Sequence, residues 1–251
     1  MEIIIIFFIA HWYLSLFSQS FLQHRYASHG AFTMNKFWER FFYVFAYITQ
    51  GSSYMSARAY GILHRMHHAY ADTDKDPHSP KHFSNLFSMM WHTKNVIKGI
   101  MKNRIETEER FTKNLPDWPL MDKWGRSMAN RIMFTGLYTG FYVLFAHHWW
   151  LFALVPVHIL MGPIHGSIIN WFAHKYGKVS FDVNNTSRNF MPFDVLMLGE
   201  DYHNNHHKFP SSANFGFKWY EIDPIYYIML MLEFAGVIKI RNKGRYIAGE
   251  Y

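Results

Sequence analysis

The sequence predicts an all-α integral membrane protein, in which a few transmembrane helices carry a cytoplasmic helical cap with a histidine-rich metal site. Three observations predict this fold class: long uncharged apolar segments, a one-sided distribution of Lys and Arg, and histidine clusters outside the apolar segments. A length of 251 residues is expected to form one domain, residues 1–251. Half of the residues are apolar and 20% are aromatic, which excludes a disordered chain.

The first apolar segment is residues 3–22, which contain no Lys, Arg, Asp or Glu. Twenty residues in a helix rise about 30 Å, which is the thickness of the hydrocarbon core of a bilayer. A signal peptide is the alternative, but it requires a basic start, and this chain starts with Met1 and Glu2. We therefore expect a membrane span at 3–22.

A second apolar block is expected to form a hairpin of two spans, 129–148 and 151–172, with a single strong charge at its edge. Trp149 and Trp150 lie between the two spans. A hairpin tip meets the far membrane interface, where aromatic side chains are favoured. The Gly-Pro pair at 162–163 is expected to bend the second helix of the hairpin.

The basic residues indicate on which side of the membrane the rest of the chain lies. No Lys or Arg precedes Arg25, and none lies between Arg131 and Lys175. The aromatic segment 37–57 either spans the membrane or lies at its surface as an interfacial or re-entrant segment. If it does not cross, every basic residue is on one side, which the positive-inside rule makes the cytoplasm. The predicted cytoplasmic cap is then 23–128 and 173–251.

The net charge of +7 is interpreted as a membrane-facing surface, because no nucleic-acid-binding motif accompanies it. Cysteine is absent, which excludes disulfides, iron–sulfur clusters and thiolate zinc sites. Histidine is abundant, with 17 residues, so imidazole is the metal ligand that this chain offers.

Three histidine clusters lie outside the apolar segments. Two of them, HRMHH at 64–68 and HNNHH at 203–207, share the spacing i, i+3, i+4, which places three imidazoles on one face of a helix. The third, HRYASH at 24–29, has the spacing i, i+5 and suits a helix end or a loop. Gathered imidazoles repel one another once protonated, so three such clusters predict a metal centre. The candidate ligands are His24, His29, His64, His67, His68, His203, His206 and His207.

Asn170 and His174 lie one helical turn apart where the hairpin re-enters the cytoplasm, and His174 is a further candidate ligand. The other histidines are expected to have structural or ordinary roles. Those within the expected spans should be packed and hydrogen-bonded: His11, His158 and His165. Those of the loop after the second cluster should be ordinary: His78, His82 and His92. Those beside the tryptophans should be interfacial anchors: His147 and His148.

The type of ligand restricts the metal. Calcium and magnesium prefer oxygen ligands, and zinc uses three or four protein ligands rather than eight or nine. Two ions with four or five imidazoles each favour iron, and a membrane setting with apolar substrates suits oxygen chemistry. His67 and His68 cannot serve one haem together, because neighbours on a helix point about 100° apart.

These motifs, in this order and around these spans, resemble those of the membrane fatty acid desaturases, especially the Δ9 acyl-CoA and acyl-lipid branch in a bacterial-type short form. The matching segments are HRYASH at 24–29, HRMHH at 64–68, NWFAH at 170–174, HNNHH at 203–207, Asp76-Pro77-His78, Asn185 to Asn189, and Gly199-Glu200. The resemblance covers nearly the whole chain. It implies a membrane enzyme whose cytoplasmic cap holds two iron ions and which uses O2 to introduce a cis double bond, at the Δ9 position, into a saturated acyl chain.

The resemblance also implies the ligands and the partners. One iron ion would take His24, His29, His64, His68 and His206. The other would take His67, His174, His203 and His207, with Asn170 acting through a water molecule. Electrons would arrive from a separate donor, a ferredoxin or a cytochrome b5 type protein with its reductase. The enzyme would lie in the bacterial inner membrane, with its active site on the cytoplasmic side.

Two questions stay open at this point. The acyl chain is carried either by CoA or by a lipid. The position where animal acyl-CoA desaturases have a CoA-binding Arg-Asp pair is Ile62-Leu63 here. Lys94 and Lys98 lie near, but not on, the position of a basic pair that those enzymes also use. The reaction is either desaturation or hydroxylation by a member of the same di-iron superfamily. A non-enzymatic metal-binding protein is the third alternative, and it predicts ligands inside the spans.

Overall fold

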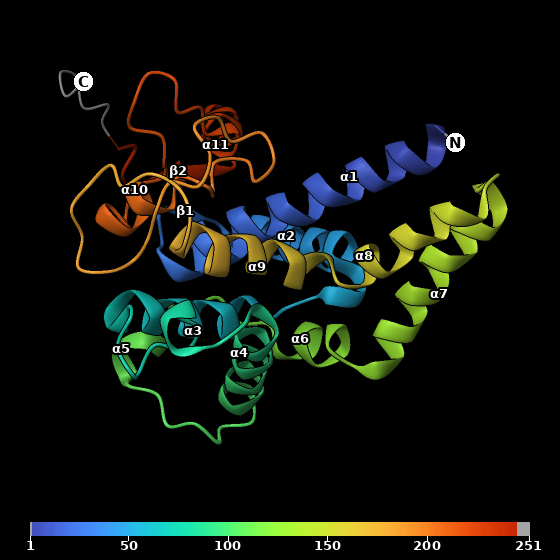
Figure 1. Cartoon of the computed structure of the whole chain (residues 1–251), viewed down its shortest axis with the longest axis horizontal. Coiled ribbons are helices and arrows are strands. Elements are labelled where there is room, and N and C mark those ends of the chain that lie inside the picture. The colour runs from blue at the N-terminus through green and yellow to red at the C-terminus, as the bar shows by residue number, and fades with distance from the viewer. Residues whose placement is uncertain (1, 245–251) are drawn as a thin grey trace.

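The computed structural model describes residues 2–244, and these residues are mostly helical (Figure 1). Residues 1 and 245–251, which the predicted domain and cap include, lie outside the described residues. The helical elements in chain order are α1 (Glu2–Ser18), η1 (Gln19–Ser28), α2 (Lys36–Gln50), η2 (Gly51–Ser53), α3 (Ala57–Tyr70), η3 (Pro80–His82), α4 (Leu86–Met101), α5 (Glu109–Thr112), α6 (Pro119–Gly125), α7 (Met128–Phe145), η4 (Trp149–Leu154), α8 (Val155–Ile159), α9 (Met161–Trp171), η5 (Phe172–His174), α10 (His203–Lys208) and α11 (Pro224–Phe234). Two short strands, β1 (Phe32–Met34) and β2 (Ile238–Ile240), pair in an antiparallel ribbon.

Helices α1 and η1 form one continuous helix over Glu2–Ser28, which contains the predicted first span. It is 27 residues long and contains an 18-residue stretch with a mean hydropathy of 1.6. Within residues 2–244 it is the one unbroken helix that is long and apolar enough to cross a membrane. The continuous helix brings the first histidine cluster directly from this apolar segment into the cap.

The predicted hairpin of two spans, 129–148 and 151–172, is corrected by the structure. Helix α7 ends at Phe145 and falls short of the hydropathy of a span, because Asn130 and Arg131 near its start are strongly polar. The second half of the hairpin is bent by 68° between two helical segments, Trp149–Ile159 and Met161–His174. This pair can be a broken span or a re-entrant loop by length and composition.

The bend expected from the Gly-Pro pair is present, at Leu160. Proline at 163 has no N–H, and its ring clashes with the carbonyl four residues earlier, which is that of Ile159. Ser52 of η2 satisfies this carbonyl, since its hydroxyl donates to the Ile159 oxygen at 3.1 Å. The N–H of Gly162 donates to the hydroxyl of Ser53 at 3.1 Å. The break is therefore held by two hydroxyls from a neighbouring segment.

The segment 37–57, which was ambiguous in sequence, consists of α2, η2 and the start of α3. Helix α2 packs along α1 and is 15 residues long, so it extends only about 22 Å and is too short to cross a bilayer core alone. Its inner side is buried through Phe42, Tyr43 and Ala46. Its outer side exposes apolar residues one turn apart: Phe37, Phe41, Val44 and Ile48.

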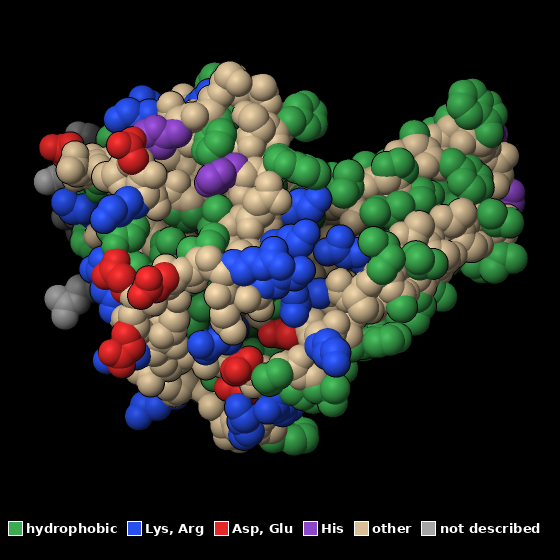
Figure 2. All heavy atoms as spheres, turned by 90° about the horizontal axis from the view of Figure 1, so that it is seen from below, with side chains coloured by type: hydrophobic (Ala, Val, Ile, Leu, Met, Phe, Trp, Pro, Cys, Tyr) green, Lys and Arg blue, Asp and Glu red, His purple; other side chains and the backbone are tan. Residues whose placement is uncertain are grey.

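The molecule divides into an apolar arm, which contains α1, α7 and α8, and a polar cap, which contains α3, α5 and α10. Figure 1 shows the arm reaching away from the cap. Figure 2 shows hydrophobic side chains covering the arm, whereas the charged side chains gather over the rest of the molecule. Trp149 at the tip is 85% exposed. The cap is closed by β1 and β2, which pair with Phe32 opposite Ile240 just after the first histidine cluster.

Candidate metal centre

The first histidine cluster lies at the end of a π-helix. The N–H of His29 donates to the carbonyl of His24 at 3.2 Å, which is the i to i+5 bond of this helix type. This bond explains the spacing of the cluster, because residues five apart lie on nearly the same face of a π-helix but not of an α-helix. The rings of His24 and His29 consequently lie close together, with their centroids 5.1 Å apart.

The second and third clusters lie on helices, as their spacing predicts. Helix α3 starts at the N-cap Ser56, whose side chain accepts a hydrogen bond from the N–H of Ala59, and carries the second cluster in its last two turns. The third cluster forms the six-residue helix α10. Adjacent imidazoles on a helix point about 100° apart, so each helix supplies ligands in two directions. His67 and His68 accordingly belong to different groups.

Five imidazoles form the first group, and their potential ligand nitrogens all lie within 4.8 Å of one another. The contacts run between Nε2 atoms: His64 to His29 at 2.9 Å, His64 to His68 at 3.0 Å, and His206 to His24 and His68 at 3.0 and 2.9 Å. The members of this five-histidine group are His24, His29, His64, His68 and His206.

Four imidazoles form the second group, again with ligand nitrogens within 4.8 Å of one another. The Nε2 of His203 lies 3.0 Å from those of both His174 and His207, and the Nε2 of His67 lies 3.3 Å from that of His207. The members of this four-histidine group are His67, His174, His203 and His207. The structure therefore brings together the same two sets that the family resemblance implied, including His174.

The arrangement of the nitrogens fits a metal better than a hydrogen-bond network. Each Nε2 carries either one hydrogen or one lone pair, so several mutually close Nε2 atoms cannot all be satisfied by one another. Two nitrogens bound at right angles to an ion about 2.1 Å away would be about 3.0 Å apart. The observed Nε2 to Nε2 distances of 2.9 to 3.3 Å agree with such a shared ion.

Burial and mutual repulsion favour the neutral form of seven of the nine imidazoles by lowering their pKa. The pKa of His64, of His68 and of His206 is lowered well below the usual value of 6.5, first by burial and then by the neighbouring histidines. A neutral imidazole has a lone pair on one ring nitrogen and can bind a metal without first losing a proton. The electrostatics of the two groups therefore favour metal binding at neutral pH.

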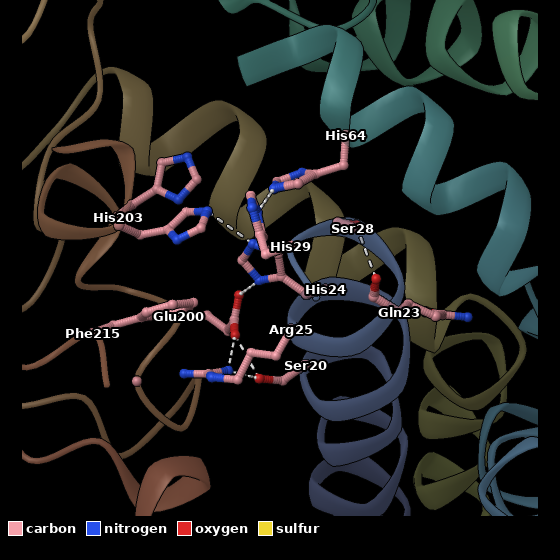
Figure 3. A network of polar contacts seen from close by, with 12 residues as sticks. Ser20, Gln23, His24, Arg25, Ser28, His29, His64, Glu200, His203 and Phe215 are labelled. Atoms are coloured by element: carbon pink, nitrogen blue, oxygen red, sulfur yellow. Dashed lines mark hydrogen bonds and ion pairs between the residues drawn. The ribbon is translucent and has the colours of Figure 1, made fainter. Parts of the chain in front are cut away.

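A buried ion network holds His24 of the five-histidine group (Figure 3). The Nδ1 of His24 pairs with Glu200, and the guanidinium of Arg25 donates to Glu200 at 2.6 Å and to Asp223 at 2.8 Å. Burial opposes the charge of Glu200, but His24 and Arg25 outweigh it and lower the pKa of Glu200 to about 2. A carboxylate in this position fixes the tautomer of the imidazole and leaves Nε2 for the metal.

The four-histidine group has comparable contacts that the sequence analysis did not assign. The Nδ1 of His67 lies 2.9 and 3.0 Å from the two carboxylate oxygens of Asp76, and the Nδ1 of His174 lies 3.1 Å from the hydroxyl of Thr186. Asp76 and Glu200 both stand in segments that match the family motifs. Their proximity to the clusters in sequence was the signal that could have identified them.

The prediction that His78 is an ordinary loop residue was wrong. His78 is 2% exposed and stacks on His67 with ring centroids 4.2 Å apart. Neither of its ring nitrogens has a hydrogen-bond partner among the described residues. The turn after α3 folds back over the second cluster, because Asp76 accepts hydrogen bonds from the N–H groups of Asp72 and His78. His82 and His92 are exposed, as expected of loop and surface residues.

The histidines of the arm are structural. His11 and His158 pair through their Nδ1 atoms at 2.5 Å, and the Nε2 of His158 lies 2.9 Å from the hydroxyl of Tyr142, so the predicted hydrogen bonding is confirmed for both. His165 is buried and packs edge-on against Trp12, but its ring nitrogens have no hydrogen-bond partner within residues 2–244, so that part of the prediction was wrong. The anchor candidates at the tip are both exposed: His147 and His148.

Asn170 lines a small hollow beside the five-histidine group. The hollow has space of about 20 Å³, which is room for about one water molecule. Its polar wall includes His24, His64 and Glu200, and its apolar wall includes Leu16. The structure thus places Asn170 next to members of the five-histidine group, and its role as a ligand through water stays a prediction.

The family model for fatty acid desaturases matches residues 3–236, nearly the whole described chain. The chain belongs to the fatty acid desaturase family. The desaturase is 30% identical over 219 residues to Delta-9 acyl-lipid desaturase 1 of Arabidopsis thaliana, a match that covers 85% of this chain and 67% of the relative. It is 32% identical over 222 residues to the sn-1 stearoyl-lipid 9-desaturase of Synechocystis sp., covering 86% of this chain and 64% of the relative. The chain thus spans about two thirds of the length of these relatives.

The family is membrane-associated and iron-dependent. The desaturase agrees with both properties, since it has an apolar helix long enough to cross a membrane and two histidine groups that could hold metal ions. The resemblance seen in the sequence is therefore confirmed at the level of the family.

Proposed function

We propose that this desaturase introduces a cis double bond at the Δ9 position of a saturated acyl chain in an O2-dependent reaction. The observation that carries the proposal is the pair of histidine groups, nine imidazoles in all, whose ligand nitrogens gather at two points. The C–H bonds of a methylene chain have no acidic proton, so a general base cannot activate them, whereas a redox metal can. Two bound iron ions would supply the O2-dependent oxidation that removes two hydrogens from adjacent methylenes.

The residues of the chain would hold and shield this centre. His24 is fixed by Glu200, and His67 is fixed by Asp76, so one imidazole of each group is oriented before any metal binds. The hollow beside His24 has space for only about one water molecule, which keeps bulk water from the five-histidine group. An acyl chain can enter this hollow only if side chains of α1 and α9 move apart.

The residues of this desaturase favour a lipid over CoA as the carrier of the acyl chain. The position at which the animal acyl-CoA enzymes carry a charged pair is occupied here by Ile62 and Leu63, each 4% exposed. Both belong to an apolar cluster with Ile100 and Phe111, so no charged group is available there for CoA. Two of the relatives above are named as acyl-lipid or stearoyl-lipid desaturases, which supports the same carrier.

The membrane arrangement is part of the proposal. The arm, with its exposed apolar side chains, would enter the bilayer of a bacterial inner membrane, and the cap would lie on the cytoplasmic side. The one-sided distribution of Lys and Arg supports this orientation. Electrons would come from a separate ferredoxin or cytochrome b5 type donor with its reductase.

Expression in a host that lacks the activity tests the proposal. Mass spectrometry of the membrane lipids, with the position of the double bond determined, should show a new cis-9 monounsaturated acyl chain that requires O2. The matched control is His67→Ala, which removes one proposed ligand and should give no such product. Hydroxylated acyl chains as the main product would replace desaturation by hydroxylation, and iron binding without any new acyl product would contradict both.

A further inference from the structure

Each histidine group contains one imidazole whose Nδ1 faces a buried carboxylate. His24 pairs with Glu200 in the five-histidine group, and His67 pairs with Asp76 in the four-histidine group. Such a carboxylate accepts the Nδ1 proton and increases the electron donation of the imidazole to a bound metal. The two groups are therefore alike in having one imidazole that pairs with a carboxylate.

The charges behind the two carboxylates differ. Glu200 is neutralised by the fully buried Arg25, which also pairs with Asp223. Asp76 forms an ion pair with no Lys or Arg among the residues that the structure describes, and its other partners are two backbone N–H groups. The negative charge next to His67 is therefore uncompensated, whereas the one next to His24 is compensated.

A second pair of charges increases the difference. In the four-histidine group, the Nδ1 of His174 contacts the hydroxyl of Thr186, and this hydroxyl donates to Asp72 at 3.2 Å. A second carboxylate is therefore connected to an imidazole of this group through one intervening hydroxyl. Behind His29 of the five-histidine group lies a cation instead. The guanidinium of Arg65 donates to the carbonyls of Ala27 and Ser28 at 3.0 and 2.7 Å, directly before His29 in the chain.

The two groups differ in the net charge around them. On the five-histidine side, the guanidinium groups of Arg25 and Arg65 oppose the carboxylates of Glu200 and Asp223, and burial raises the pKa of the neighbouring Asp194 and Asp201 to about 6 and about 8, which reduces their negative charge. On the four-histidine side, Asp72 and Asp76 form ion pairs with no Lys or Arg within residues 2–244. Charges that are buried, or one contact from a buried ligand, are screened much less than those on the exposed surface.

From this asymmetry we infer that the two metal positions have unequal reduction potentials. An iron ion held by the four-histidine group loses an electron more readily than one held by the five-histidine group, because nearby negative charge stabilises ferric over ferrous iron. With two ferrous ions bound, His67, His174, His203 and His207 would hold the ion that is oxidised first, its single electron passing to the mediator dye of a titration, while the ion held by the five-histidine group would stay ferrous. The inference rests on the proposed two-iron centre, and it makes Asp76 and Asp72 positioning residues that act through His67 and His174.

A redox titration of the purified full chain, loaded with ⁵⁷Fe and poised with mediator dyes, tests the inference. Mössbauer spectra should show two separate one-electron steps, the first of which stops when half of the iron is ferric. Asp76→Asn should move only the first step to more positive potential, by about a tenfold change in the ferric to ferrous ratio, which is about 59 mV for one electron. Asp72→Asn should move the same step in the same direction by less. Glu200→Gln should move only the later step.

Asp122→Asn is the matched control. Asp122 is as buried as Asp76, with 4% against 5% exposure, and it accepts hydrogen bonds from Tyr54 and Ser56 but contacts no histidine. Its change should leave both steps in place. If Asp76→Asn loses iron, Asp72→Asn decides the result, because Asp72 reaches its histidine only through Thr186. Two irons with one common midpoint, or a shift of the later step by Asp72→Asn, would overturn the inference alone. An iron content far from two per chain would contradict the two-iron proposal itself.

Discussion

The N–H of His29 donates to the carbonyl of His24 across one turn of π-helix, at 3.2 Å. This single bond places both imidazoles of the first cluster in the five-histidine group, although five residues are too many for one α-helical turn. The irregular turn at the end of an otherwise apolar helix is therefore part of the proposed metal centre.

Replacement of His29 should weaken the binding of one of the two proposed metal ions. His29→Ala leaves four imidazoles in the five-histidine group, as many as the four-histidine group has, so this group should still bind iron but more weakly. The iron that remains after dialysis against a chelator should fall from about two to about one per chain, and turnover should be lost. Metal analysis of the purified protein measures this. His82→Ala is the control, because His82 lies on the exposed part of the loop. Unchanged iron in His29→Ala would show that this group does not hold a metal as proposed.

Removal of Arg25 should destabilise the fold strongly. Arg25→Met leaves Glu200 and Asp223 as buried carboxylates without their cation, and breaking a buried ion pair in this way costs about 3–5 kcal/mol. The free energy of unfolding of the detergent-solubilised protein measures the effect. Arg104→Met, at an exposed position, is the control. A loss no larger than that of Arg104→Met would contradict the role assigned to the network.

Iron should remain bound as the pH falls through 6.5, the pKa of an ordinary histidine. Burial and the neighbouring histidines lower the pKa of His64, His68 and His206 well below that value, so protons compete with the metal only at lower pH. Iron content after dialysis at a series of pH values measures this. Loss of half of the iron at pH 6.5 or above would contradict it.

The same pKa shifts predict how the metal-free protein responds to acid. In the unfolded chain these imidazoles take up protons below about pH 6.5, whereas in the folded chain they do not. The unfolded state thus binds more protons, and the free energy of unfolding should decrease as the pH falls below about 6.5. Urea unfolding of the metal-free protein between pH 7.5 and 5.5 measures this dependence.

The proposed orientation in the membrane can be tested with single cysteines, because the chain contains none. Trp149→Cys at the tip of the arm should react with a membrane-impermeant thiol reagent added outside intact cells. Lys81→Cys in the cap should react only after the cells are opened. Labelling of Lys81→Cys from outside would contradict a cytoplasmic cap.

The helical histidine clusters could be predicted from the sequence because their geometry is local. The spacing of His64, His67 and His68 determines which face of α3 each one occupies, and it needs no knowledge of the rest of the fold. The partition of the clusters into two groups required the resemblance to the family. The pairing of His24 with Glu200 joins residues 176 positions apart, and no periodicity in the sequence predicts such a contact.

Two features that the sequence did not predict have different physical origins. His78 was expected to be ordinary as part of a loop, but hydrogen bonds to Asp76, close by in the chain, fold this loop back onto His67. The bend in the span expected at 151–172 was predicted from the Gly-Pro pair, but its support was not, because the hydroxyls that satisfy the backbone at the break belong to η2, more than a hundred residues earlier in the chain. Hydropathy reports the composition of a segment, and it contains no information about such distant partners.

The distribution of the histidines along the chain determines when the centre can be completed during synthesis. The five-histidine group joins His24 to His206, which lie 182 positions apart, and the four-histidine group needs His207. During translation the first two clusters leave the ribosome well before the third, so neither group is complete until α10 has emerged. The pairing of β1 with β2 closes the cap later still, at residue 240. Loading of the proposed centre would consequently wait until α10 has emerged, and a nascent chain stalled before residue 203 carries imidazoles but no finished site.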